Sequence, residues 1–146
     1  MRPGWSTLFA ALFCFLAEAA AAEQLVGRTR VIDGDTIVVG GITVRLKGIA
    51  APEVARGGSP GKPGGAEASA FMEKMVGGRT AACELTRERT WGRRVGYCSV
   101  GGTELGEAIV RAGLARDCPP YSGGRYASVE PAAARALPFP GYCKRR

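Results

Sequence analysis

Two carboxylates separated by one glycine are the first residues in this sequence whose spacing suggests chemistry. Asp33 and Asp35 flank Gly34 within the stretch Val31-Ile32-Asp33-Gly34-Asp35-Thr36-Ile37. Carboxylates this close can offer oxygen ligands to Ca²⁺ or Mg²⁺, although the stretch lacks the further ligands of an EF-hand loop. An Asp-Gly pair between apolar residues is also a common hairpin signal, so the motif alone indicates either a cation site or a turn.

Charged residues near the end of the next apolar run suggest an anionic substrate. Arg45 alternates with apolar neighbours as in a strand, and Glu53 follows Pro52 on the loop beyond it. Further along, Trp91-Gly92-Arg93 combines a stacking face, a residue that lets the backbone turn sharply and a second arginine. Taken singly, each of these charged residues is more often a solvated surface group.

The complete sequence contains no histidine, which excludes a large group of mechanisms. Ser-His-Asp and Cys-His hydrolysis need an imidazole, and so do His-ligated zinc and iron sites. Chemistry in this chain therefore depends on carboxylates, arginines, hydroxyls, thiols or a metal bound through oxygen. The net charge of +7, from 20 Lys and Arg against 13 Asp and Glu, favours a polyanionic partner.

The first 22 of the 146 residues have the features of an export signal. Arg2 precedes an apolar stretch over residues 8–17, and Ala20-Ala21-Ala22 precedes Glu23. The apolar stretch is shorter than the roughly 20 residues that span a bilayer. We therefore predict a signal peptide over residues 1–22 and one domain over 23–146. The mature chain is expected to be secreted or periplasmic, monomeric and free of the membrane.

Four cysteines remain once Cys14 leaves with the signal. An even number in an oxidising compartment predicts two disulfides, and no pair has the CxxC spacing of a redox or zinc motif. Three connectivities are possible. We favour Cys83–Cys98 and Cys118–Cys143, because each joins segments that a hairpin or a chain end would bring together.

The elements that must position these residues follow from hydrophobic periodicity. Strands are expected where apolar and polar residues alternate: 24–39 with a break at 33–35, 42–49, 80–85 and 95–100. Helices are expected at 66–76, at 105–114 and, less regularly, around 125–136, where Pro131 must lie in the first turn. Gly40-Gly41 predicts a hairpin turn, 57–65 a surface loop and 86–94 a charged loop. This order fits a mainly β fold with helices (β+α), a five-stranded oligonucleotide-binding (OB-fold) barrel with about three packed α-helices.

Five motifs in the same order resemble the staphylococcal nuclease (thermonuclease) family. They are IDGDT at 32–36, RLKGIAAPE at 45–53, GAEASAFMEKMV at 65–76, WGR at 91–93 and EAIVRAGLA at 107–115. Together they span most of the mature domain, and their order is far more specific than any one of them. The resemblance implies an OB-fold barrel with three helices and Ca²⁺-dependent hydrolysis of DNA and RNA phosphodiesters.

The resemblance also implies a role for each motif residue. Arg45 and Arg93 fall on the two arginines that hold the scissile phosphate, and Glu53 falls on the general base for the attacking water. Asp35 falls on a metal-ligating aspartate and Asp33 on an aspartate beside the metal. These roles suit the chemistry, because two guanidiniums can bind the charge that develops on the phosphate oxygens and an ionised glutamate can take the proton.

One position departs from the family pattern. The second metal-binding carboxylate would lie at Ala50, although the carbonyl of Ala51 remains as a possible ligand. Because Ca²⁺ takes 6–8 oxygens and its affinity follows ligand charge, we expect a weak site that depends on water and substrate phosphate. The competing view is a reshaped cavity in which Lys47 supplies positive charge in place of the ion.

The sequence therefore favours an exported nuclease with little sequence specificity. The alternative is a catalytically impaired protein of the same fold that binds nucleic acid or another envelope polyanion. Such barrels bind strands through basic grooves and aromatic platforms, for which the candidates are Trp91, Tyr97, Tyr121 and Tyr126. The presence of Arg45, Glu53 and Arg93, the predicted catalytic trio, favours the enzyme. Ala50 favours the binding protein.

Overall fold

The computed structural model describes residues 21–144, so nearly all of the predicted signal peptide, including Cys14, lies outside the described residues. The strands are β1 (Glu23–Asp33), β2 (Thr36–Val39), β3 (Ile42–Leu46), β4 (Ile49–Ala50), β5 (Thr80–Thr90), β6 (Arg93–Val100), β7 (Thr103–Glu104) and β8 (Arg116–Asp117). The helices are α1 (Gly65–Val76), α2 (Leu105–Arg111) and α3 (Pro119–Ser122), followed by the 3₁₀ turns η1 (Ala132–Ala136) and η2 (Gly141–Cys143).

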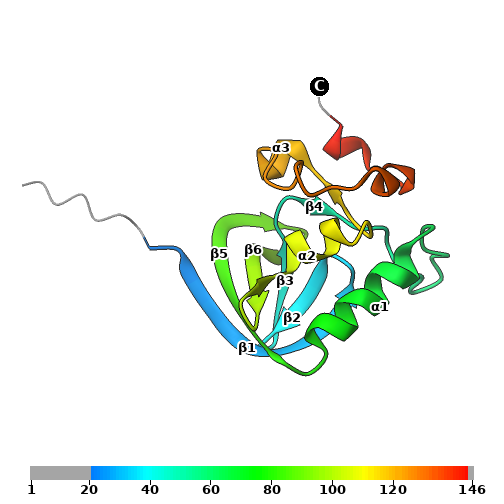
Figure 1. The fold of residues 1–146 in the computed structure, drawn as a ribbon. Coiled ribbons are helices and arrows are strands. Elements are labelled where there is room, and N and C mark those ends of the chain that lie inside the picture. The colour runs from blue at the N-terminus through cyan, green and yellow to red at the C-terminus, as the bar shows by residue number, and fades with distance from the viewer. Residues whose placement is uncertain (1–20, 145–146) are drawn as a thin grey trace, which may run out of the picture.

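Five of the strands close into a ring. The main sheet has the order β3-β2-β1-β5-β6-β7 with antiparallel neighbours, and a parallel pairing of β3 with β6 completes the circuit. β4 and β8 form a separate two-stranded ribbon beside it. The predicted β+α class, with a closed five-stranded arrangement and three helices, is confirmed in that form (Figure 1).

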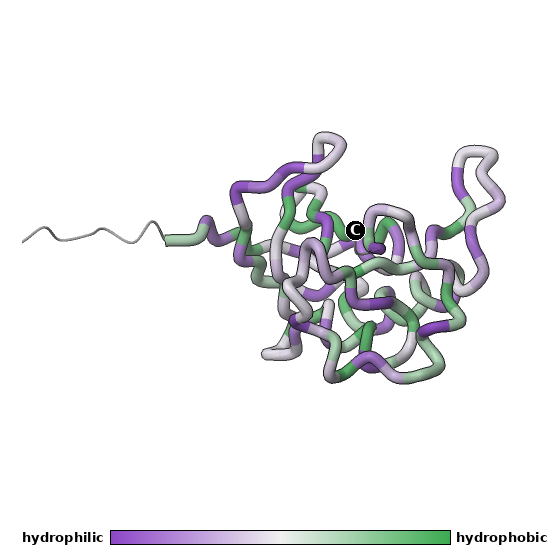
Figure 2. The backbone as a smooth tube through the Cα atoms, turned by 90° about the horizontal axis from the view of Figure 1, so that it is seen from above, coloured by the Kyte–Doolittle hydropathy of each residue, from purple (hydrophilic) through white to green (hydrophobic). Residues whose placement is uncertain are grey.

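The core lies between the strand ring and the first two helices. Ile37 and Leu46 from the strands, Met72 from α1 and Ile109 from α2 are all essentially inaccessible. α1 crosses β1 and also contacts α2. The loops that project from the body are mostly purple or white in Figure 2, so the apolar segments concentrate within it.

Two turns predicted from glycine are confirmed. Gly40 and Gly41 both have positive φ, 54° and 84°, and join β2 to β3. The β1–β2 register shifts between Val31 and Asp33, at the predicted break. A side chain at Gly34 would meet the Cβ of Ala68 at 2.7 Å, so glycine lets α1 approach the turn that carries the two aspartates.

The predicted charged loop over 86–94 is wrong. β5 continues to Thr90 and β6 begins at Arg93, with a turn at Trp91 (φ 49°) and Gly92 (φ 76°). Backbone pairing between two strands does not require apolar side chains, so a charged ribbon extends beyond the core without the alternation that would reveal it.

The predicted helix around 125–136 is also wrong. A four-residue α3 precedes this region, and only the 3₁₀ turn η1 forms within it. Gly123 and Gly124 have positive φ (65° and 83°), and Pro131 lies immediately before η1. The strand predicted over 42–49 is likewise interrupted at Gly48, whose φ is 77°.

Both predicted disulfides are confirmed. Cys83 and Cys98 face each other across β5 and β6, and Cys118 at the start of α3 is bonded to Cys143 in η2. The second bond fastens the C-terminal segment beside α3 and above β4, as Figure 1 shows. Among residues 21–144, no helix combines the length and the apolar character needed to cross a membrane.

Candidate active site

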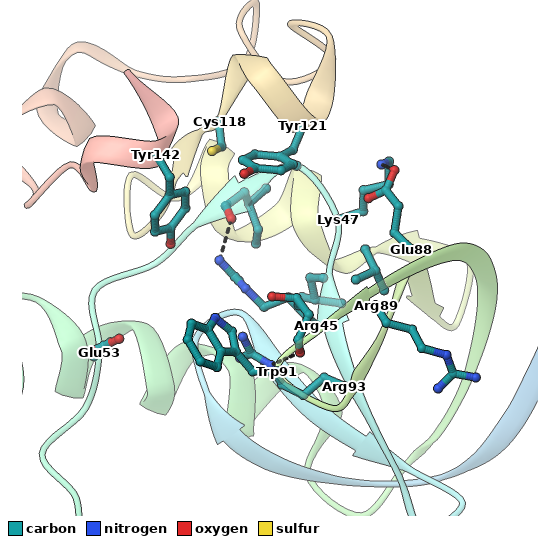
Figure 3. A pocket seen from close by; sticks show the side chains of 15 residues that line it. Arg45, Lys47, Glu53, Glu88, Arg89, Trp91, Arg93, Cys118, Tyr121 and Tyr142 are labelled. Atoms are coloured by element: carbon teal, nitrogen blue, oxygen red, sulfur yellow. Dashed lines mark hydrogen bonds and ion pairs between the residues drawn. The ribbon is translucent and has the colours of Figure 1, made fainter. Parts of the chain in front are cut away.

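Two neighbouring cavities meet at the predicted catalytic residues. The larger has a volume of about 680 Å³ and the smaller about 370 Å³. The residues that line both are Arg45, Glu53, Arg93 and Tyr142. Three of these were predicted from sequence, and the structure brings them together from β3, from the loop after β4 and from the start of β6 (Figure 3).

Arg45 is held in one orientation by its surroundings. Its Nη1 lies 2.5 Å from Oδ2 of Asp35, and its Nη2 donates to the carbonyl of Ile49 at 3.0 Å. Both charged side chains are largely buried, at 13% and 10% exposed. Burial lowers the pKa of Arg45, but the negative charge of Asp35 outweighs burial and raises that pKa above its ordinary value. The guanidinium is therefore fixed and charged.

Arg93 is anchored at the start of β6 and linked to Arg45 through two side chains. Its Nε donates to the carbonyl of Thr90 at 3.2 Å, and its Nη1 donates to Oγ1 of Thr36 at 3.2 Å. The Thr36 hydroxyl donates in turn to Oδ1 of Asp35 at 3.1 Å. One hydrogen-bonded chain thus joins the two guanidiniums, with Asp35 as its central acceptor.

Glu53 lies on the loop after β4, with an exposed side chain that lines both cavities. Its backbone is fixed by the glycine-rich segment that the sequence indicated only as a surface loop. The carbonyl of Glu53 accepts from Lys62 N at 2.8 Å, and a side chain at Gly65 would collide with the same carbonyl oxygen. The glycine at the start of α1 therefore allows the helix to pack against the loop that carries Glu53.

The two aspartates of the first motif accept hydrogen bonds from other groups of the protein. Asp33 Oδ1 accepts from the Asp35 amide at 3.1 Å. The Asp35 oxygens accept from Arg45, Thr36 and the Ala51 amide, the last at 2.9 Å. Burial raises the pKa of Asp35 to about 6, against the opposing charge of Arg45.

The donor set does not fit a preformed calcium cage. In the part of the chain that the structure describes, no three His, Cys, Asp or Glu side chains are grouped to hold a metal. The oxygens of Asp35 are already taken by donors of the protein, whereas Ca²⁺ takes 6–8 oxygens. The position expected to weaken the site, Ala50, is 1% exposed and packs with Cys118, Cys143 and Phe139.

Lys47 does not take the place of an ion beside Asp35. Its Nζ lies 2.5 Å from Oε1 of Glu88, and both side chains line the larger cavity but not the smaller one. The structure therefore does not place the Lys47 charge beside Asp35, as the competing view of a reshaped cavity expected.

The aromatic candidates separate into two groups. Trp91, 94% exposed, and Tyr121, 50% exposed, line the larger cavity. Tyr97 lies under the guanidinium of Arg125 at 4.4 Å, and Tyr126 is buried, so neither offers a free ring face to that cavity.

Tyr142, which also lines both cavities, was not among the residues predicted from the sequence. No motif marks this residue. The available signal was its neighbour Cys143, because the predicted bond to Cys118 ties the C-terminal segment to the helix that carries Tyr121.

Comparison with known proteins gives a consistent group of relatives. A family model described as "Staphylococcal nuclease homologue" matches residues 43–136. The chain is 33% identical over 122 residues to the succinoglycan biosynthesis protein ExoI of Rhizobium meliloti (strain 1021), which covers 80% of this chain and 64% of that protein. It is 32% identical over 102 residues to the thermonuclease of Staphylococcus hyicus, covering 66% of this chain and 60% of that one. With the thermonuclease of Staphylococcus intermedius it shares 34% identity over 93 residues, covering 60% and 55%. The chain thus spans less than two thirds of the length of each relative.

Proposed function

The chain belongs to the staphylococcal nuclease family, and we propose that it is a nuclease that hydrolyses phosphodiester bonds of DNA or RNA with little sequence specificity. The observation that carries this proposal is the convergence of Arg45, Arg93 and Glu53 where the two cavities meet. Two oriented guanidiniums that line the same cavities as an exposed carboxylate suit the cleavage of an anionic ester. The thermonucleases among the relatives support the same reaction.

The proposed reaction is attack by water on the phosphorus. Glu53 takes the proton from the water as its oxygen bonds to phosphorus, and the bond to the leaving oxygen breaks, with that oxygen taking up a proton. Negative charge grows on the non-bridging oxygens, where Arg45 and Arg93 can donate bidentate hydrogen bonds. Because both guanidiniums are already oriented, little reorganisation is needed during the reaction.

Calcium is the usual cofactor of the family, but the residues present here do not form its cage. Asp35 is committed to Arg45, Thr36 and the Ala51 amide. In this chain the two arginines therefore supply the positive charge that the site needs.

The wider surface suits a nucleic-acid strand. We propose that the five-stranded ring is an OB-type barrel and that the larger cavity is its substrate groove, with Trp91 and Tyr121 as stacking faces. The net charge of +7 favours such a substrate. The two disulfides suit a secreted or periplasmic protein released from its signal peptide.

The test is cleavage of single-stranded and duplex DNA and of RNA by the disulfide-intact mature chain, with Ca²⁺, with Mg²⁺ and with chelator. We expect Arg45→Ala, Arg93→Ala and Glu53→Gln each to lower kcat by about 10²–10³-fold. Glu53→Gln should leave the affinity for uncleaved DNA nearly unchanged. Arg111→Ala is the matched control, because that exposed arginine on α2 pairs with Glu107 and lines neither cavity. Turnover at the wild-type level in all three variants would place the chemistry elsewhere.

One observation favours the alternative of a binding protein without catalysis. Ala50 and the engaged Asp35 leave the family's metal site incomplete. That alternative predicts tight, salt-dependent binding of oligonucleotides by the wild type with no cleavage under any metal condition.

A further inference from the structure

We propose that Tyr142 is a positioning residue for Arg45 and that the Cys118–Cys143 disulfide holds it there. Residues 138–143, here called the C-terminal strap, carry Tyr142 over the site. The inference rests on the proposed nuclease function and adds a residue that acts through the phosphate-binding arginine.

The position of Tyr142 is the first observation. It is the one residue outside the predicted trio that lines both cavities among those the structure describes. Pro138, Phe139 and Pro140 of the strap line the smaller cavity as well. The C-terminal strap therefore forms a wall of the site rather than a surface tail.

The contact with Arg45 is the second observation. In Figure 3 the Tyr142 hydroxyl points toward the Arg45 guanidinium, and both residues line the same two cavities. Asp35 binds Nη1 and the Ile49 carbonyl accepts from Nη2. The tyrosine hydroxyl restrains Arg45 from the strap, independently of the β1–β2 turn and β4, which provide the other two contacts.

The anchoring of the strap is the third observation. Cys143 is buried in a small cluster with Cys118, Ala50 and Phe139, and the Phe139 ring lies 3.9 Å from the Arg116 guanidinium carbon. The Tyr142 ring meets Tyr121 edge to face, with centroids 6.2 Å apart.

Proline at 138 and 140 further restricts the strap backbone. The C-terminal strap, which contains only the 3₁₀ turn η2, is thus held by covalent, apolar and aromatic contacts. These contacts fix the position of Tyr142 near Arg45.

This arrangement predicts an effect on the rate more than on substrate affinity. An exposed arginine loses side-chain freedom when it engages the phosphate, whereas one restrained on several sides is already oriented. Removing the hydroxyl alone leaves the ring, its contact with Tyr121 and the disulfide in place.

The decisive experiment is Tyr142→Phe, with Tyr97→Phe as the matched control because Tyr97 lines neither cavity. On a single-stranded oligonucleotide, we expect Tyr142→Phe to lower kcat about tenfold, as the loss of one polar contact to a charged group in the reacting state would. KM should stay within about twofold, and the melting temperature and the control variant should match the wild type. In an Arg45→Lys background the same change should have little further effect, since the tyrosine acts through Arg45. Wild-type kcat in Tyr142→Phe, or an equal drop in the Arg45→Lys background, would overturn the proposal.

A second pair of variants tests the tether. Cys118→Ser combined with Cys143→Ser should lower kcat at least as much as Tyr142→Phe, and adding Tyr142→Phe to it should change nothing more. Cys83→Ser combined with Cys98→Ser is the matched control, since it removes the disulfide between β5 and β6 and leaves the strap tethered. At temperatures where this variant stays folded, it should have lower stability than the wild type but the same kcat. Full kcat in the Cys118/Cys143 variant would refute the role of the disulfide.

Failure of the proposed function gives a different result. If the wild type cleaves no substrate, the nuclease proposal is wrong, and NMR of the Arg45 guanidinium protons then tests the contact directly. Tyr142→Phe should shift these signals and speed their exchange with water, and Tyr97→Phe should not. Unchanged Arg45 signals in Tyr142→Phe would contradict the inference without reference to activity.

Discussion

Ala50→Asp is the substitution that most sharply tests how this site differs from its family. From the sequence, an aspartate at this position is expected to restore a missing calcium ligand. In the structure, Ala50 is 1% exposed and its neighbours are Cys118, Cys143 and Phe139. We therefore expect the substitution to destabilise the fold without creating a calcium site.

The expected loss of stability in Ala50→Asp follows from the burial of position 50. A carboxyl group placed in an apolar cluster without a hydrogen-bond partner costs about 1–3 kcal/mol even when neutral. Extra atoms in a packed cluster cost about 1–3 kcal/mol more. A total of about 4 kcal/mol, at about 4 °C per kcal/mol for a domain of this size, lowers the melting temperature by roughly 15 °C.

The assay is thermal unfolding with and without saturating calcium, and the matched control is Ala50→Asn. Asparagine has nearly the same shape as aspartate but carries no charge, so burial should destabilise both variants similarly. Calcium at one hundred times its Kd would stabilise a real site by about 2.7 kcal/mol. We expect no such increase for either variant.

The reasoning fails if calcium raises the melting temperature of Ala50→Asp and not that of Ala50→Asn. That result would mean that the side chain at position 50 turns toward Asp35 and that the apolar cluster rearranges with little loss of stability. Activity at limiting calcium should then rise in the same variant.

Three further outcomes are expected. All four mature cysteines should be oxidised. The bonds that close loops of 15 and 25 residues should contribute about 3 and 3.5 kcal/mol to stability in the chain-entropy model, so reduction should lower the melting temperature. A freely alkylated thiol in the native protein would contradict the pairing. The pKa of Asp35 is raised from 3.8 to about 6, so the folded state binds the Asp35 proton more tightly than the unfolded state does. The contribution of this carboxyl group to stability should therefore fall as pH rises from about 4 to about 6. Denaturant titrations of wild type and Asp35→Asn across that pH range measure this change in the free energy of unfolding. Trp91→Ala should weaken oligonucleotide binding by about tenfold with an unchanged melting temperature, since the ring is 94% exposed; equal affinity would remove Trp91 from the substrate groove.

Features encoded in neighbouring residues were predictable from the sequence. The Gly40-Gly41 turn, α1 and the break at Gly34 follow from local conformational preference and periodicity. Both disulfides followed from pairing segments that a hairpin or chain end brings together. The three candidate catalytic residues followed from motifs whose order is preserved along the chain.

Features set by long-range contacts were not predictable in the same way. The β5–β6 ribbon continues through charged residues because each strand satisfies the backbone of the other, whatever side chains it carries. The expected helix after residue 125 is absent because Pro131 interrupts the segment and the Cys118–Cys143 disulfide determines where the chain must return. Tyr142 has no periodic or motif signal, since its place depends on a bond between residues 25 positions apart.

The alanine at position 50 and the disulfide beside it are physically one arrangement. β4 pairs with β8, and the Cys118 amide donates to the carbonyl of Gly48, so the start of α3 lies directly against Ala50. A disulfide offers no countercharge, and a carboxylate in contact with it would be buried without a partner. A methyl group is small and apolar enough to let the bond form there, and the same bond joins the segment that carries Tyr142 to the start of α3. The position where the family pattern has a metal carboxylate thus lies beside the bond that anchors the strap. In our proposal the positive charge at the phosphate comes instead from Arg45, which pairs with Asp35 and toward which the Tyr142 hydroxyl points.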